Sequence, residues 1–239
     1  MVVKNQPTVS TALKAAIGLE FWWQEARRTL DWAHLGAVVL LLVAGVSGGP
    51  AAAGISVSTL ARWMEQLMPL LGILLFTNLL CKGGCQESLE LAAARGSGVA
   101  GIFIRRLIVT FIFLCCFIAV AMAVYMNSLP LETLWRTVAT ALVGGLFFGL
   151  LGAALAHKLG SSTSGLSLAA SIWACLVLLT IVMPSANALW RLLAPMPAFL
   201  GVVGPTFWWN RAAYTGAALL LLLLNMRLLK RPARLFLSD

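Results

Sequence analysis

The most distinctive polar stretch of the sequence is CKGGCQESLELAAARGSG, residues 81–98, which separates two long apolar runs. Glycines near both ends of this stretch predict one short helix, over residues 83–98. On that helix Gln86, Glu87 and Glu90 share a face, because residues three or four apart are neighbours. We expect this face, with its carboxylates, to point into the cytoplasm, while the opposite apolar face rests on membrane-embedded helices.

Charged and polar side chains inside apolar segments are the second set of candidates. Glu65 lies one turn into such a segment, and Arg62 precedes it by three residues. Ionisable groups inside a membrane are unfavourable and commonly functional. Two interpretations stay open: a surface pair at the outer interface, or a polar lining for a translocation path to which Asn78 could also contribute. For Thr77, Asn78 and Asn225 we expect hydrogen bonds between helices and not a role as ligands.

The other reactive side chains form no catalytic or metal-binding pattern. The sequence has 5 cysteines, an odd number that argues against a disulfide framework, and His34 and His157 lie far from Cys81 and Cys85. It contains no GxxxxGK[ST], HExxH or GxSxG motif. The serine-rich GSSTSG at residues 160–165 lacks the lysine of a phosphate-binding loop, and we expect a short loop there. We therefore predict no metal site, no cofactor and no enzyme active site in this chain.

Composition places these residues in a membrane protein. Of the 239 residues 61% are hydrophobic and only 10% are charged, whereas a soluble domain carries about 25% charged residues. The net charge is +9, but the basic residues lie at the ends of apolar runs and form no patch of their own. We therefore expect membrane lipid as a partner and no nucleic acid.

The elements that must position the candidates are membrane-spanning helices, each needing about 20 mostly apolar residues. Period-two alternation is absent, so the predicted fold is all-α with six spans in a single transmembrane domain, residues 1–239. The predicted spans are Ala33–Gly49, Leu60–Leu80, Leu107–Met126, Leu134–Ala156, Leu166–Met183 and Ala212–Leu229.

Loop charges predict the orientation of these spans. Basic residues precede the first span, follow the second and occur throughout the tail, and the loop after the fourth span holds Lys158. The alternate loops are nearly neutral. By the positive-inside rule, both termini are then cytoplasmic in a multi-pass protein of the plasma or inner membrane.

A helix is also predicted before the first span, over Ser10–Asp31. One face is largely apolar and includes Trp22 and Trp23, and the other carries Arg27 and Arg28. This pattern is typical of a helix that lies in the membrane interface. The alternative is an ordinary amphipathic helix packed on protein.

The segment before the last span, residues 184–205, is apolar but contains four prolines, Pro184, Pro195, Pro197 and Pro205. Non-helical backbone at membrane depth is tolerated only where protein or a cavity covers it. We expect short re-entrant helices in the outer leaflet that close the outer end of the bundle. Trp208 and Trp209 would then mark a membrane interface.

Small residues in the fourth span predict close helix packing. Gly144, Gly145, Gly149 and Gly152 recur at helical spacing within GGLFFGLLG. Sequence alone leaves open whether this face lies inside one protomer or between two.

This layout resembles the permease subunit of an ABC transporter of the six-helix type-2 exporter class. In that family an interfacial helix precedes the first span, re-entrant helices join spans five and six, and a coupling helix between spans two and three has a pattern like E-x-x-x-G-T-L-E-x-L-L-x-x-P. Here Ser88, Leu89, Glu90 and Leu91 stand where the family has T-L-E-x, with Glu90 in the glutamate position. Glu87 stands where the family has glycine, and the proline of the family's pattern would fall near Gly96.

The resemblance implies a transport function powered from outside the chain. Separate ATP-binding subunits would bind ATP and Mg and push on the coupling helix, where residues 86–91 would dock. A second permease chain, identical or related, would complete the path. The cargo would be hydrophobic or amphipathic, such as a lipid, peptide or drug-like molecule, and its direction export.

Two other classes of function remain compatible with the sequence. One is an intramembrane hydrolase or lipid-modifying enzyme with an unrecognised site, which requires titratable residues that converge at one depth in the spans. The other is a membrane scaffold or immunity-type protein, which requires no polar path.

Overall fold

The computed structural model describes residues 57–79, 98–125, 131–183, 194–197, 200, 202 and 204–229. Within these ranges the fold is helical and contains no strand. The helices are α3 (Val57–Thr77), α5 (Gly98–Tyr125), α6 (Leu131–Leu159), α7 (Ser162–Val182) and α9 (Pro205–Leu229). The predicted all-α class is confirmed for this part of the chain. Five of the predicted apolar segments coincide with helices, and the first, Ala33–Gly49, lies outside the described residues.

Four of these helices are long and apolar enough to cross a membrane, and together they make the chain a multi-pass membrane protein. The qualifying stretches are Ala100–Val120, Leu134–Leu159, Ser162–Val182 and Pro205–Leu229. The apolar part of α3, Met64–Thr77, is shorter. Large apolar side chains such as Leu220 and Val182 are exposed on the outside of the bundle, as suits lipid contact.

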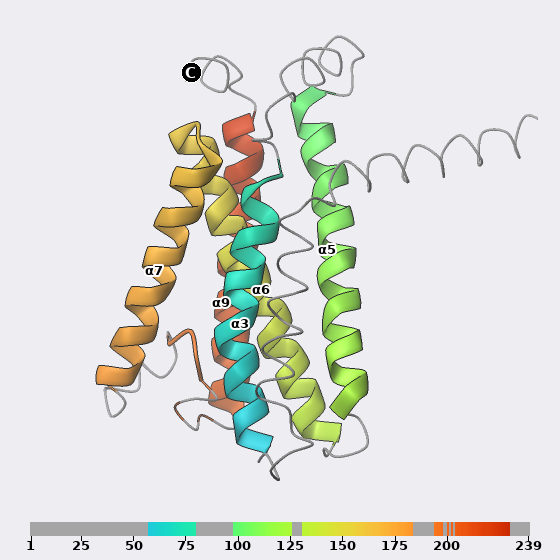
Figure 1. Ribbon diagram of the computed structural model, residues 1–239, viewed down its shortest axis with the longest axis vertical. Coiled ribbons are helices and arrows are strands. Elements are labelled where there is room, and N and C mark those ends of the chain that lie inside the picture. Colours follow the sequence, from blue (N-terminus) through green and yellow to red (C-terminus); the bar gives the residue numbers. More distant parts are fainter. Residues whose placement is uncertain are drawn as a thin grey trace, which may run out of the picture.

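Successive described helices run in opposite directions, so their ends gather at two levels (Figure 1). At one level, where α3, α6 and α9 end, lie Arg105, Arg106, Lys158 and Arg227, and we call it the basic end. At the other level, which we call the ion-pair end, lie Arg62, Glu65, Glu132, Arg136 and Arg211.

Helix α6 is the centre of the bundle, and its glycine face packs against α3. A Cβ atom on Gly72 of α3 would collide with the backbone of Gly145, and one on Gly149 would lie 2.8 Å from the Phe76 ring. The missing side chains therefore let the two backbones touch. The face predicted around Gly144 lies inside the protomer, which decides the question that the sequence left open.

The connection between α6 and α7 is shorter than the predicted GSSTSG loop. Gly160 takes a positive φ of 70°, and α7 already begins at Ser162. Ser161 caps the helix, because its Oγ accepts a hydrogen bond from the Ser164 amide at 3.4 Å. The prediction of a loop over the whole stretch is therefore wrong, since a serine cap and a single left-handed glycine complete the turn.

Helix α5 begins earlier than the predicted span, at Gly98 instead of Leu107, and so includes Arg105 and Arg106. Hydropathy placed these arginines before the membrane segment. Arg106 is buried, and its Nη1 donates a hydrogen bond of 2.8 Å to the backbone carbonyl of Leu79 at the end of α3. This bond gives Arg106 a carbonyl acceptor just beyond the end of α3, which lets α5 carry a buried arginine.

Candidate functional site

The candidate site begins with a short non-helical segment at the ion-pair end. Ala194, Pro195, Met196 and Pro197 are all buried. Prolines at two of these positions exclude a regular helix, because each removes a backbone donor and fixes φ. Helix α9 starts directly after Gly204, which takes a φ of 70°. Buried backbone of this kind needs partners for its carbonyl groups.

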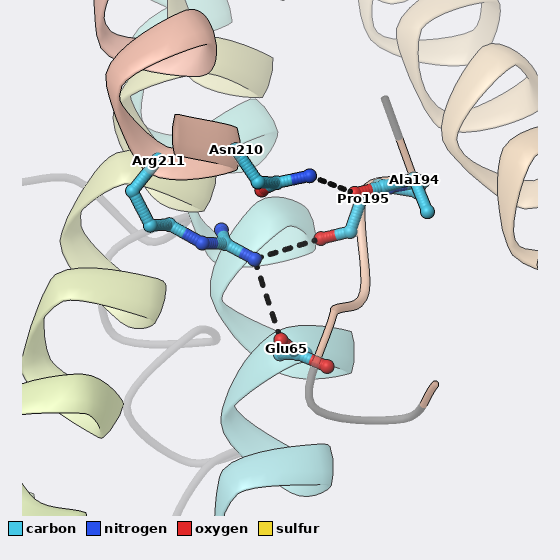
Figure 2. A network of polar contacts seen from close by, with 5 residues as sticks. All are labelled: Glu65, Ala194, Pro195, Asn210 and Arg211. Carbon is cyan, nitrogen blue, oxygen red and sulfur yellow. Dashed lines mark hydrogen bonds and ion pairs between the residues drawn. The ribbon is translucent and has the colours of Figure 1, made fainter. Parts of the chain in front are cut away.

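Two adjacent side chains of α9 supply these partners. Asn210 Nδ2 donates to the carbonyl of Ala194 at 2.9 Å, and Arg211 Nη2 lies 3.4 Å from the carbonyl of Pro195. Figure 2 shows both side chains of α9 pointing toward this segment. The segment is thereby attached to α9 through its backbone.

The same Arg211 guanidinium also reaches α3. Its Nη2 lies 3.3 Å from Glu65 Oε1, and the two side chains are only 4% and 0% exposed (Figure 2). A buried charge is strongly unfavourable without a partner, so each of these ions makes burial of the other tolerable. We call Glu65, Ala194, Pro195, Asn210 and Arg211 the ion-pair cluster.

Aromatic rings on α9 surround the cation of this cluster. The Arg211 guanidinium carbon lies 5.4 Å from the centre of the Phe207 ring and 6.0 Å from that of Tyr214. Both distances fall within the range of cation–π attraction. Arg136 of α6 also lies 6.0 Å from the Phe207 centre, and it pairs with Glu132 at 2.6 Å. Arg211 is therefore held by α3 and the Ala194–Pro197 segment through polar contacts and by its own helix through aromatic rings.

A second buried polar group lies at the basic end and contains no charge pair. His157 Nδ1 of α6 donates to Asn225 Oδ1 of α9 at 2.9 Å. Asn225 Nδ2 donates in turn to the carbonyls of Leu150 and Leu221. Phe103 of α5 places its ring edge-on to His157, with centroids 5.5 Å apart. The group joins three helices through neutral side chains.

The structure changes the interpretation of Glu65. The surface-pair alternative is wrong, because Glu65 is buried and pairs with Arg211, 146 residues away. The side chain of Arg62 lies outside the described part. Asn78 lies at the opposite end of α3, about 20 Å along the helix axis from Glu65, so the two do not form one site.

Polar residues near the basic end divide between two roles. Asn225 forms hydrogen bonds between helices, as predicted. For Thr77 the prediction is wrong, since its hydroxyl donates to Ile73 of its own helix at 2.6 Å. Gly152 of α6 packs directly against this hydroxyl and offers no side chain to receive it.

The remaining predicted site residues lie outside the described part of the chain. They are the candidate coupling face with its neighbours, Gln86, Glu87, Ser88, Leu89, Glu90 and Leu91, and the candidate interfacial residues Trp22, Trp23, Arg27 and Arg28.

Sequence reasoning missed Arg211 and Asn210 as site residues. Their signal was present, because an Asn-Arg pair at the start of an apolar segment is unusual. What the sequence could not supply was the partner. No protein-family model, curated protein or solved structure matches the chain.

Proposed function

We propose that the chain is the transmembrane permease subunit of an ABC transporter of the type-2 exporter class. In this proposal it spans the plasma or inner membrane six times with both termini in the cytoplasm. It moves a hydrophobic or amphipathic cargo outward, together with a second permease chain. ATP and Mg bind to partner subunits, which dock on residues 86–91.

The observation that carries the proposal is the buried, non-helical Ala194–Pro197 segment at one end of an antiparallel bundle. The type-2 exporter resemblance implies short re-entrant helices between the last two spans on the outer side. Of that connection the structure describes residues 194–197, which are buried and non-helical, together with residues 200, 202 and 204. Asn210 and Arg211 satisfy carbonyls of the segment, which supports a closed position for it.

The charge distribution supports the proposed orientation. Among the described residues the basic end carries Arg105, Arg106, Lys158 and Arg227 and no acidic residue. The ion-pair end has both signs of charge, with Glu65 and Glu132 among its residues. A cytoplasmic basic end follows the positive-inside rule, and it puts the end of α3 and the start of α5 on the side where ATP is available.

Close packing of α3 on α6 suggests how work done on the basic end could reach the other end. Gly72 and Gly145 bring the two backbones into contact, so α3 and α6 move as one body in this proposal. A push at the end of α3, transmitted through residues 86–91, would then displace Glu65 relative to helices that pack less closely on α3. The permease contributes no chemistry of its own and converts closure of its partners into a change of helix positions.

Co-purification with ATP-binding subunits tests the proposal. The full chain should associate with the ATPase it serves and stimulate ATP hydrolysis, and Glu90→Arg should abolish both effects. The matched control is Glu132→Arg, the same substitution on an exposed acid at the ion-pair end. Association and hydrolysis that persist in Glu90→Arg would contradict the coupling role, and loss of both in Glu132→Arg would show a general defect instead.

A further inference from the structure

Helices α3 and α9 meet at the ion-pair end along a contact with little packing of its own. Each makes its main helix–helix contact with α6, α3 through the glycine face and α9 through residues such as Phe147–Tyr214. Glu65 and Arg211 bridge the two helices directly. We call this contact the α3–α9 seam.

The Ala194–Pro197 segment belongs to the α9 side of the seam. Asn210 holds the Ala194 carbonyl at 2.9 Å, and Arg211 lies against Pro195 and the rings of Phe207 and Tyr214. All of these groups come from α9 or from the segment itself. Separation at the seam therefore leaves them together and lengthens the Glu65–Arg211 contact.

The charge contact across the seam is long. At 3.3 Å it exceeds the roughly 2.7–2.9 Å usual for hydrogen bonds between two ions. The same Arg211 Nη2 also contacts the Pro195 carbonyl at 3.4 Å. The ion pair therefore rests on one nitrogen that has two acceptors, and it is not bidentate. The contact is weak enough in geometry to separate, provided that water replaces it.

Water must enter when the pair separates. A guanidinium parted from its carboxylate in a dry site would be far less stable than the closed pair, so an intermediate that is open and dry is excluded. Separation therefore requires an open, hydrated arrangement as the alternative to the closed, buried one that the structure shows. Such bistable contacts are the elements on which conformational switches are built.

We propose that the Glu65–Arg211 pair is a releasable lock on the α3–α9 seam, and that its separation moves Ala194–Pro197 away from α3 and opens a hydrated passage at the ion-pair end. The use of that passage for cargo release rests on the proposed transport function. The lock itself is a property of this chain and is testable without partner subunits.

A single-cysteine reporter measures the opening. All 5 native cysteines of the full chain are replaced by Ala, Ala194→Cys is introduced, and the protein is placed in lipid nanodiscs so that both ends meet solvent. Ala194 is fully buried in the closed arrangement, so reaction with a water-soluble maleimide reports opening. Glu65→Gln should raise the labelling rate at least about tenfold, because it removes the charge that keeps the seam closed.

Three controls decide between a lock and a general loosening. Glu132→Gln, at the same end of the bundle, should leave labelling of the Ala194→Cys reporter within about twofold of the parent. A second reporter, Ala153→Cys in the buried face of α6, should stay unlabelled in Glu65→Gln. Equal labelling of Ala194→Cys with and without Glu65→Gln overturns the lock, and so does an equal rise at both reporters.

Substitutions of the cation keep the test decisive if Glu65→Gln fails to accumulate. Arg211→Lys retains the charge and should label slowly, whereas Arg211→Gln should label fast. Equal rates in these two variants would refute the lock. Failure of the ATPase co-purification together with this labelling pattern would remove the proposed function and leave the lock in place.

Discussion

The two ends of the bundle bury polar groups in different ways. At the ion-pair end, a carboxylate and a guanidinium meet across α3 and α9 through one contact of 3.3 Å. At the basic end, His157 and Asn225 meet across α6 and α9 at 2.9 Å, and Asn225 also bonds Leu150 at 3.1 Å. One end thus joins two loosely packed helices with charge, and the other joins two well-packed helices with neutral groups.

The difference teaches which end can move. Neutral groups that hydrogen-bond each other between packed helices strengthen an already rigid contact. Burying them without water costs little free energy while the bonds are made. A buried ion pair between poorly packed helices is sensitive to any loss of its partner. We therefore assign movement to the ion-pair end and rigidity to the centre and the basic end.

Removal of the buried carboxylate should have the largest effect. Glu65→Leu leaves Arg211 without its anion, and we expect the free energy of unfolding to fall by about 3 kcal/mol or more. Denaturation of the purified chain in mixed micelles measures the change. Glu132→Leu, which removes an exposed carboxylate, should stay within about 0.5 kcal/mol of the parent. A similar loss in both variants would erase the contrast between buried and exposed charge.

Crowding of the centre should have the next largest effect. Gly72→Ala forces a methyl group into the Gly145 backbone, and overpacking of this kind destabilises by about 1–3 kcal/mol. Gly216→Ala is the matched control, because in the described part of the chain no heavy atom beyond its own turns of α9 lies within 4 Å of the added methyl. Unfolding in mixed micelles should separate the two variants, and equal stability would argue against contact between the α3 and α6 backbones.

The neutral group at the basic end should respond more weakly. Asn225→Ala removes the partner of His157 Nδ1, which we expect to lower stability by about 1–2 kcal/mol. Thr215→Ala, which removes a hydroxyl bonded within its own helix, is the control. Asn225→Ala should not raise labelling of the Ala194→Cys reporter, because it leaves the α3–α9 seam unchanged. Fast labelling would show that the two ends are not independent.

The exposed pair at the ion-pair end should contribute least. Arg136 and Glu132 lie 2.6 Å apart, yet Glu132 is mostly exposed. Surface pairs on one helix contribute about 0.3–0.5 kcal/mol. Arg136→Ala should therefore change the midpoint of unfolding only slightly, and a loss near that of Glu65→Leu would mean that its contact with Phe207 is important.

Hydropathy predicted the described helices well, because a spanning helix must satisfy its own backbone and carry an apolar surface. Hydropathy misplaced the start of α5, since Arg105 and Arg106 are unfavourable on a hydropathy scale while the fold gives Arg106 a carbonyl partner at Leu79. The glycines of α6 predicted close packing correctly, but not the partner helix.

The ion pair itself was beyond sequence reasoning. Glu65 was recognised as unusual, but its neighbour Arg62 is the partner that local spacing suggests. The observed partner, Arg211, is 146 residues away, and only the packing of α3 and α9 around α6 brings the two charges together. Local pattern identifies an ion that needs a partner, whereas tertiary structure determines which partner it has.

A double-mutant cycle tests most directly the claim that charge joins α3 to α9. The four proteins are the parent, Glu65→Leu, Arg211→Leu and the double variant, with unfolding measured in mixed micelles. We predict that the double variant loses less stability than the two single variants lose together, by about 1.5 kcal/mol or more, because contacting charges couple. Single losses that add to within about 0.5 kcal/mol would contradict the pair, and with it the lock at the ion-pair end.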